Sequence, residues 1–149
     1  MASLDFATED GVNGVYDRLI DAKVQIFHGD MEVVGEVRIL PIMQFVVRIP
    51  FETGNLMARW AMAPPGKGRF AKVKLSLTER AVAETHTWEL QKAFVYRMEE
   101  VEFPSDSHNA TSQENIMVVV IRGVLVNGED YNGKNVLTMT SSRGGSTAS

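Results

Sequence analysis

One segment of this 149-residue chain has helical periodicity, and almost every other apolar run has the composition or two-residue alternation of a β-strand. In "LMARWAMA" (Leu56–Ala63), the apolar Leu56, Trp60 and Ala63 fall at i, i+4 and i+7, on one face of a short helix. The turn "PPGKG" ends this helix, because the residue before a proline is disfavoured in the α region. Parallel strands need helical crossovers between them, so a chain with one helix is expected to be antiparallel.

Several segments have the pattern of strands. The clearest is "RFAKVKLSLT", where Val73, Leu75 and Leu77 alternate with Lys72 and Lys74, as in a half-buried antiparallel strand. We therefore expect a mainly β fold, an antiparallel β-barrel or sandwich of six to seven strands with one short flanking α-helix. The expected strands are Ala22–Phe27, Met31–Leu40, Ile42–Phe51, Arg69–Thr78, His86–Glu102 (one strand, or two at a bend near Ala93-Phe94) and Ile116–Val126.

The composition, and the positions of glycine and proline residues that interrupt regular structure, predict one domain with two flexible ends. A chain of this length with 44% hydrophobic residues can bury one core. Residues 1–17 are polar, acidic and interrupted by glycine, and we expect them to form a flexible acidic arm. Residues 18–137 are expected to form a single β-barrel domain, and residues 138–149 a flexible polar tail. Within the domain, residues 28–30 and 40–42 are expected to be short connections between strands.

No set of residues has the spacing that catalysis or metal binding requires. Cysteine is absent, which excludes thiolate nucleophiles, zinc–sulfur sites and disulfides. "PPGKG" lacks the first glycine of a P-loop and a Ser or Thr after Lys67, which favours a plain turn. The histidines His28, His86 and His108 have no partner at metal-ligand spacing. We therefore expect a protein that is not an enzyme, with no catalytic residue, cofactor or metal site; an enzyme would need a pocket that joins His86 or His108 to the carboxylates of Glu99–Glu102.

The charges are clustered along the chain. The net charge of −4 argues against general nucleic-acid binding. One basic and one acidic cluster can each be a solvated face, or the two can meet between copies of the same protein. In the second case the suspected subunit contacts are the basic Lys67, Arg69, Lys72 and Lys74 and the acidic Glu99, Glu100 and Glu102.

The apolar runs also predict where the protein acts. The first residues lack the basic and apolar regions of a secretory signal peptide. The longest unbroken apolar stretch, Ile116–Ile121, is too short to span a bilayer. We therefore expect assembly in the cytoplasm, no membrane insertion, and export only through a dedicated apparatus.

Four segments share a pattern of apolar and aromatic residues with a known family. They are "LMARWA" (Leu56–Ala61), "GRFAKVKLSL" (Gly68–Leu77), "TWELQKAFVYRMEEVEF" (Thr87–Phe103), with its closest match at Leu90, Ala93, Phe94 and Val95, and "NIMVVVIRGVLVNG" (Asn115–Gly128). On these residues the chain resembles the tube protein of type VI secretion systems, the Hcp family, and in particular a divergent branch of it. The tail-tube proteins of contractile phages and of extracellular injection particles share the fold and fit nearly as well.

The resemblance implies a β-barrel subunit that forms hexameric rings, which stack into a tube inside a contractile sheath and carry or deliver effectors. The implied partners are further copies of the chain, sheath, baseplate or spike proteins, and effector cargo. A phage-like tail tube or hub protein is one alternative, and a monomeric β-barrel that binds a small ligand is another. Apolar residues on both faces of Met117–Val120 favour assembly, because they suit a strand covered on both sides. The short connection expected at 40–42 departs from the family, whose members usually have a long subunit-contact loop there.

Overall fold

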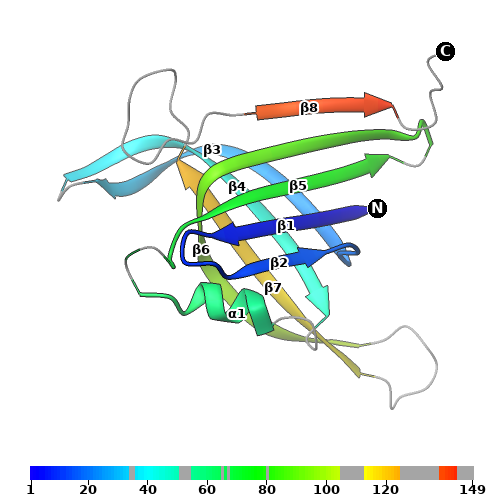
Figure 1. Ribbon diagram of the computed structural model, residues 1–149, viewed down its shortest axis with the longest axis horizontal. Helices are drawn as coiled ribbons and strands as arrows, with labels where there is room; N and C mark the ends of the chain where they lie inside the picture. The colour runs from blue at the N-terminus through cyan, green and yellow to red at the C-terminus, as the bar shows by residue number, and fades with distance from the viewer. Residues whose placement is uncertain are drawn as a thin grey trace.

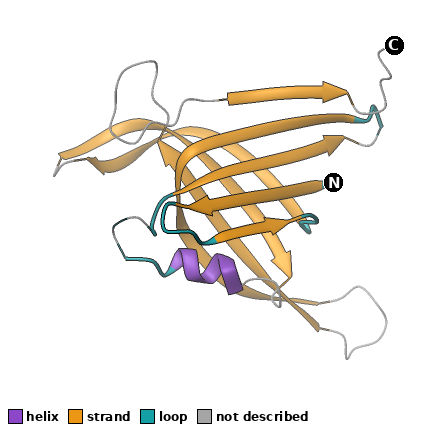
Figure 2. Cartoon of the chain, viewed as in Figure 1, coloured by secondary structure: helices purple, strands orange, loops and turns teal. Residues whose placement is uncertain are grey.

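The computed structural model has two layers of antiparallel strands, with one helix at one end of them (Figures 1 and 2). It describes residues 1–33, 36–50, 55–64, 66, 68–79, 81–104, 113–124 and 138–143. The predicted fold class, mainly β with a single short helix, is confirmed. The strands are β1 (Ala2–Thr8), β2 (Asn13–Tyr16), β3 (Asp21–Val33), β4 (Glu36–Pro50), β5 (Ala71–Glu79), β6 (Glu84–Pro104), β7 (Gln113–Val124) and β8 (Thr138–Arg143), and the helix is α1 (Asn55–Ala61).

The long strand β6 belongs to both layers. Neighbouring strands follow the order β2-β1-β5-β6-β7-β4-β3, and β8 pairs with β6 beside this path. The first half of β6 pairs with β5 and β8, and its second half pairs with β7. A register shift between Val95 and Arg97 lies at this change of partner, which is the bend predicted near Ala93-Phe94. We call the layer of β2, β1, β5, β8 and the first half of β6 sheet A, and the layer of β3, β4, β7 and the second half of β6 sheet B.

The core lies between the two sheets. Along β5 the buried Ala71, Val73 and Leu75 alternate with exposed lysines, as the sequence predicts. Burial of each large apolar side chain contributes about 1.5–3 kcal/mol, so the alternating rows are the main stabilising feature. The largest side chains of the core cluster that are fully or almost fully buried are Leu4, Met43, Phe45, Val47, Ile49, Met57, Trp60, Val73, Leu75, Leu90 and Ile121.

Trp60 joins α1 to the sheets. Its indole Nε1 donates a hydrogen bond to the Arg69 carbonyl oxygen at 2.8 Å. Its ring stacks on Phe6 with the centroids 4.8 Å apart, and Phe6 in turn stacks on Tyr16. The buried face of α1 is therefore formed by Trp60 and Met57, whereas Leu56, which the helical periodicity places on that face, is exposed.

The predicted flexible arm over residues 1–17 is wrong. β1 pairs with β5 along its whole length, and Leu4 and Phe6 are no more than 2% exposed. The acidic side chain of Asp5 alternates with these apolar residues, so the composition is polar while the two-residue period is that of a strand. The predicted polar tail also includes structure, because residues 138–143 form β8 against β6. The sheets therefore extend past both ends of the domain predicted over 18–137.

The connections predicted at residues 28–30 and 40–42 are also wrong, because both segments lie inside one long hairpin. In the β3–β4 pairing His28 faces Pro41, and Gly29 faces Leu40. A proline is tolerated there because β7 pairs with β4 only from Ile42 onward, which leaves the second edge of β4 without a described partner at Pro41. Gly29 lets Ile42 approach closely, since an added Cβ would lie 2.8 Å from its Cδ1. The short connection expected at 40–42 is therefore not present there.

Candidate assembly surfaces

Two residues of the predicted basic cluster lie on the outward face of sheet A. Lys72 and Lys74 alternate with the buried Val73 along β5 and are exposed. Arg69 is exposed before β5, and its carbonyl oxygen anchors the helix. Lys67 lies outside the described residues. Two of the four predicted contacts, Lys72 and Lys74, thus lie on the same face of sheet A.

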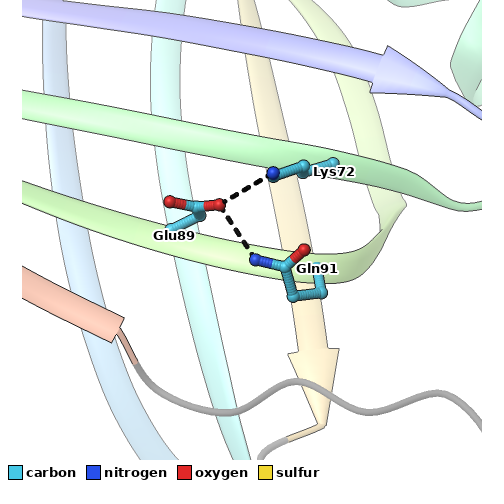
Figure 3. Close-up of polar contacts among 3 residues, drawn as sticks. All are labelled: Lys72, Glu89 and Gln91. Carbon is cyan, nitrogen blue, oxygen red and sulfur yellow. Dashed lines mark hydrogen bonds and ion pairs between the residues drawn. The ribbon is translucent and has the colours of Figure 1, made fainter.

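The charges on this surface are balanced within the chain. The Lys72 Nζ lies 3.2 Å from Oε1 of Glu89, which also accepts a hydrogen bond from Gln91 Nε2 at 2.9 Å (Figure 3). Burial alone would raise the pKa of Glu89, but the hydrogen bonds from Gln91 and Lys72 and the lysine charges together hold this pKa below its ordinary value. Lys74 lies between Asp5 on β1 and Glu89 on β6 in the strand register.

The predicted acidic cluster lies in the other sheet. Glu99, Glu100 and Glu102 are exposed on the second half of β6, which pairs with β7. Glu99 Oε1 is 3.8 Å from Arg97, and Glu100 Oε1 accepts a hydrogen bond from Asn115 Nδ2 at 2.7 Å. Because β5 pairs only with the first half of β6, the described residues of the two clusters lie in different sheets. Their role as contacts between copies stays a prediction.

The outward face of sheet B is apolar along β7. Ile42, Ile116 and Val120 are no more than 6% exposed, yet they do not belong to the core cluster. They alternate with the core residues of β4 and β7, so they point away from the core. Val46, opposite Val120 in the register, and Val118 are half-buried on the same face. The apolar character predicted for both faces of the last strand is therefore present.

A polar row crosses the same face and joins four strands. Gln44 donates from Nε2 to Gln25 Oε1 at 2.8 Å and accepts from Arg122 Nε at 2.6 Å. The guanidinium carbon of Arg122 lies 3.5 Å from the ring centroid of Tyr96 and 5.4 Å from that of Phe27. Stacking on the aromatic rings and the hydrogen bond to Gln44 both hold the Arg122 side chain in place. The polar row therefore has fixed side-chain positions beside the apolar residues of the outward face of sheet B.

A hollow of about 290 Å³ opens where β2, β4 and α1 meet. Its lining includes Val15, which is 66% exposed, and the exposed Leu56. The Tyr16 hydroxyl is buried and has no hydrogen-bond partner among the described residues. Burial raises the pKa of Tyr16, and the nearby Met57 backbone offsets part of this effect without reaching hydrogen-bond geometry. Among the described residues, the lining consists of Val15, Tyr16, Asp17, Arg18, Pro50 and Leu56.

The described residues do not bring the candidate catalytic groups together. His86 Nε2 lies 3.6 Å from Glu84 Oε1 at the start of β6, whereas Glu99 to Glu102 lie on its second half in sheet B. His28 lies within β3, and His108 is outside the described residues. In the part of the chain that the structure describes, no group of three His, Cys, Asp or Glu side chains could hold a metal ion. No helix in that part is long and apolar enough to cross a membrane.

No protein-family model matches this sequence, and no curated protein matches it. In fold, the chain is similar to one from the PVC sheath–tube complex of an extracellular contractile injection system in its extended state, with a TM-score of 0.48 and 14% identity over 93% of this chain and 88% of that chain. It is similar to one from the anti-feeding prophage baseplate, with a TM-score of 0.48 and 15% identity over 93% and 91%. It is also similar to one from the anti-feeding prophage cap, with a TM-score of 0.46 and 13% identity over 93% and 88%.

Proposed function

We propose that this protein is a structural, non-enzymatic tube subunit of a contractile injection or secretion apparatus, and that it acts by self-assembly. The observation that carries the proposal is the outward face of sheet B, where Tyr96 and Val101 are 55% and 37% exposed and Val46 and Val118 are half-buried. A solvated antiparallel sheet needs apolar residues on its inward face only, so an apolar outward face supports a further packed layer. The sequence resemblance over 51–128 supplies the class of assembly.

The resemblance supports rings of six subunits that stack head to tail inside a sheath and against baseplate or spike proteins, with effectors as cargo. It also supports assembly in the cytoplasm and export through the apparatus. The solved structures of similar fold come from sheath–tube, cap and baseplate complexes. The surfaces of this chain and the sequence resemblance support the function. A phage-like tail tube or hub protein would use the same surfaces and is the alternative within this class.

The interior gives less support to a monomeric barrel that binds a small ligand. Phe45, Met43, Leu75 and Leu90 are fully buried between the sheets. A ligand in that space would have to displace close-packed side chains. The hollow described above lies outside this interior, beside α1.

Assembly of the purified protein tests the proposal. Sedimentation velocity and negative-stain microscopy over a wide concentration range should show rings or stacked tubes. Val118→Lys should stay monomeric, because assembly would bury its charge. Val82→Lys adds the same charge at an exposed position in the β5–β6 turn and should assemble like the wild type. Circular dichroism checks that both variants fold. A wild type that stays monomeric throughout, or a Val118→Lys protein that assembles normally, would contradict the proposal.

A further inference from the structure

The hollow beside α1 contains a buried polar group without a partner. Tyr16 lines the hollow and is 8% exposed, and its hydroxyl has no hydrogen-bond partner among the described residues. The hydroxyl ends beside the backbone of Met57, the residue that follows Leu56 of the lining in α1. A buried hydroxyl without a partner costs free energy, so it indicates a ligand that accepts a hydrogen bond from it.

The hollow is apolar on two sides. Val15 of β2 and Leu56 of α1 line it and are 66% and 39% exposed, and the two elements lie beside each other (Figure 1). Pro50, at the end of β4, is a further apolar residue of the lining. The volume of about 290 Å³ is at the small end of ligand sites, which typically enclose about 300–1,000 Å³. The fitting ligand is therefore small, with one apolar group.

The lining also carries one charge of each sign. Asp17 and Arg18 both line the hollow and are exposed. The ion pairs among the described residues include neither of them, whereas Asp21 and Arg48 pair with each other at 3.4 Å. Two charges of opposite sign beside an apolar wall are complementary to a zwitterion that has an apolar group.

The backbone that carries the two charges is held at both ends. On one side it continues β2, which ends at Tyr16. On the other side the Leu19 amide donates a hydrogen bond to the Ala2 carbonyl oxygen at 2.9 Å, and the Ile20 amide donates to the Arg48 carbonyl oxygen at 2.8 Å. The segment between these anchors is two residues long, so the site is largely formed before a ligand arrives, which lowers the entropic cost of binding.

We propose that the hollow binds a free aliphatic α-amino acid. The carboxylate of the ligand accepts hydrogen bonds from the Arg18 guanidinium and the Tyr16 hydroxyl, and its ammonium group lies against the Asp17 carboxylate. Its side chain packs between Val15 and Leu56. The inference goes beyond the proposed function, because a single copy of the chain supplies every group of this site.

Saturation-transfer difference NMR with free L-leucine tests the site, because the method detects weak ligands of single chains and of assemblies alike. Leucine should bind with a dissociation constant on the order of 1 mM, as expected when one apolar side chain is buried and two exposed charges are paired. N-acetylleucine lacks the ammonium charge and leucinamide lacks the carboxylate, so each should bind about two- to fivefold more weakly. Glycine, measured by competition with leucine, should bind at least about tenfold more weakly because it has no side chain to bury.

Variants assign each group of the ligand to its partner. Asp17→Asn should weaken the binding of leucine and leucinamide but not of N-acetylleucine. Arg18→Gln should weaken the binding of leucine and N-acetylleucine but not of leucinamide. Tyr16→Phe keeps the ring that stacks on Phe6, so it should fold at least as stably as the wild type, yet it should bind both carboxylates more weakly. Asp5→Asn, at an exposed position outside the hollow, should bind all three ligands like the wild type.

The contrary outcomes are distinct. Absence of leucine binding up to about ten times the expected dissociation constant overturns the proposal. Equal affinity for leucine and N-acetylleucine overturns it in favour of the C-terminus of a polypeptide, and equal affinity for leucine and leucinamide in favour of an N-terminus. Leucine binding that Asp17→Asn and Arg18→Gln both leave unchanged overturns it as well, because the ligand then lies elsewhere. A protein that binds leucine at this site but does not assemble contradicts only the proposed function.

Discussion

Replacing Phe6 with alanine tests whether the N-terminal strands belong to the core. Phe6 is buried between Trp60 and Tyr16, with ring centroids 4.8 and 6.3 Å away. Truncation of a buried Phe to Ala costs about 3–5 kcal/mol. Of this, the stack on Trp60 accounts for about 0.5–1.5 kcal/mol. Because a domain is stable by about 5–15 kcal/mol in total, Phe6→Ala should lose a large share of its free energy of unfolding.

Urea unfolding followed by circular dichroism measures this loss, at one low protein concentration so that assembly does not contribute. Asp5→Asn, at an exposed neighbouring position on β1, is the matched control and should stay within about 0.5 kcal/mol of the wild type. A double-mutant cycle with Trp60→Ala should give a coupling of about 0.5–1.5 kcal/mol. A loss below about 1 kcal/mol for Phe6→Ala would refute this placement and return residues 1–17 to a flexible arm.

Two further predictions concern polar contacts on the two outward faces. The pKa of Glu89 lies below its ordinary value, so its stabilising contribution is present above the unfolded value of about 4.3 and is lost as the pH falls through the lower folded value. Glu89→Gln should therefore be less stable than the wild type by under about 1 kcal/mol near neutral pH. In urea unfolding this difference in stability should vanish in acid. A difference that grows in acid would contradict the contact with Lys72. On sheet B, Arg122→Lys keeps the charge but loses the planar stack on Tyr96, and should cost about 1–2 kcal/mol in a thermal melt. Arg97→Lys, at an exposed position, should melt like the wild type, and equal melting of both variants would rule out the stack as a stabilising contact.

Alternation of apolar and polar residues correctly predicted the strands in which this two-residue period is uninterrupted. In β5, Val73 and Leu75 are buried as expected, and the break near Ala93-Phe94 marks the passage of β6 between sheets. Local turn signals were less reliable. Gly29 and Pro41 indicate connections, but pairing along the whole β3–β4 hairpin outweighs these preferences. Tertiary pairing therefore decides the structure where local propensity is weak.

The candidate surfaces depend on which strands become neighbours. The sequence places Lys72 in a basic cluster, as a solvated residue or a subunit contact, whereas β5–β6 pairing places Glu89 beside it. The hollow takes Val15, Pro50 and Leu56 from three separate elements, so no local pattern could reveal it. The alternation within residues 2–8 is the signal that would have placed β1, and with it Val15, in the sheet. The residues that meet on a surface can therefore be predicted only once the order of the strands in the sheet is known.

The mass of the assembled wild-type protein in solution tests the central claim most directly. Sedimentation velocity at increasing concentration should show closed multiples of the chain, with rings of six and stacks of rings as the expected species. Val118→Lys should sediment as a single chain in the same experiment. A wild type that sediments as one chain at every concentration would contradict the account, because the exposed Tyr96 and Val101 on the outward face of sheet B would then stay in contact with water.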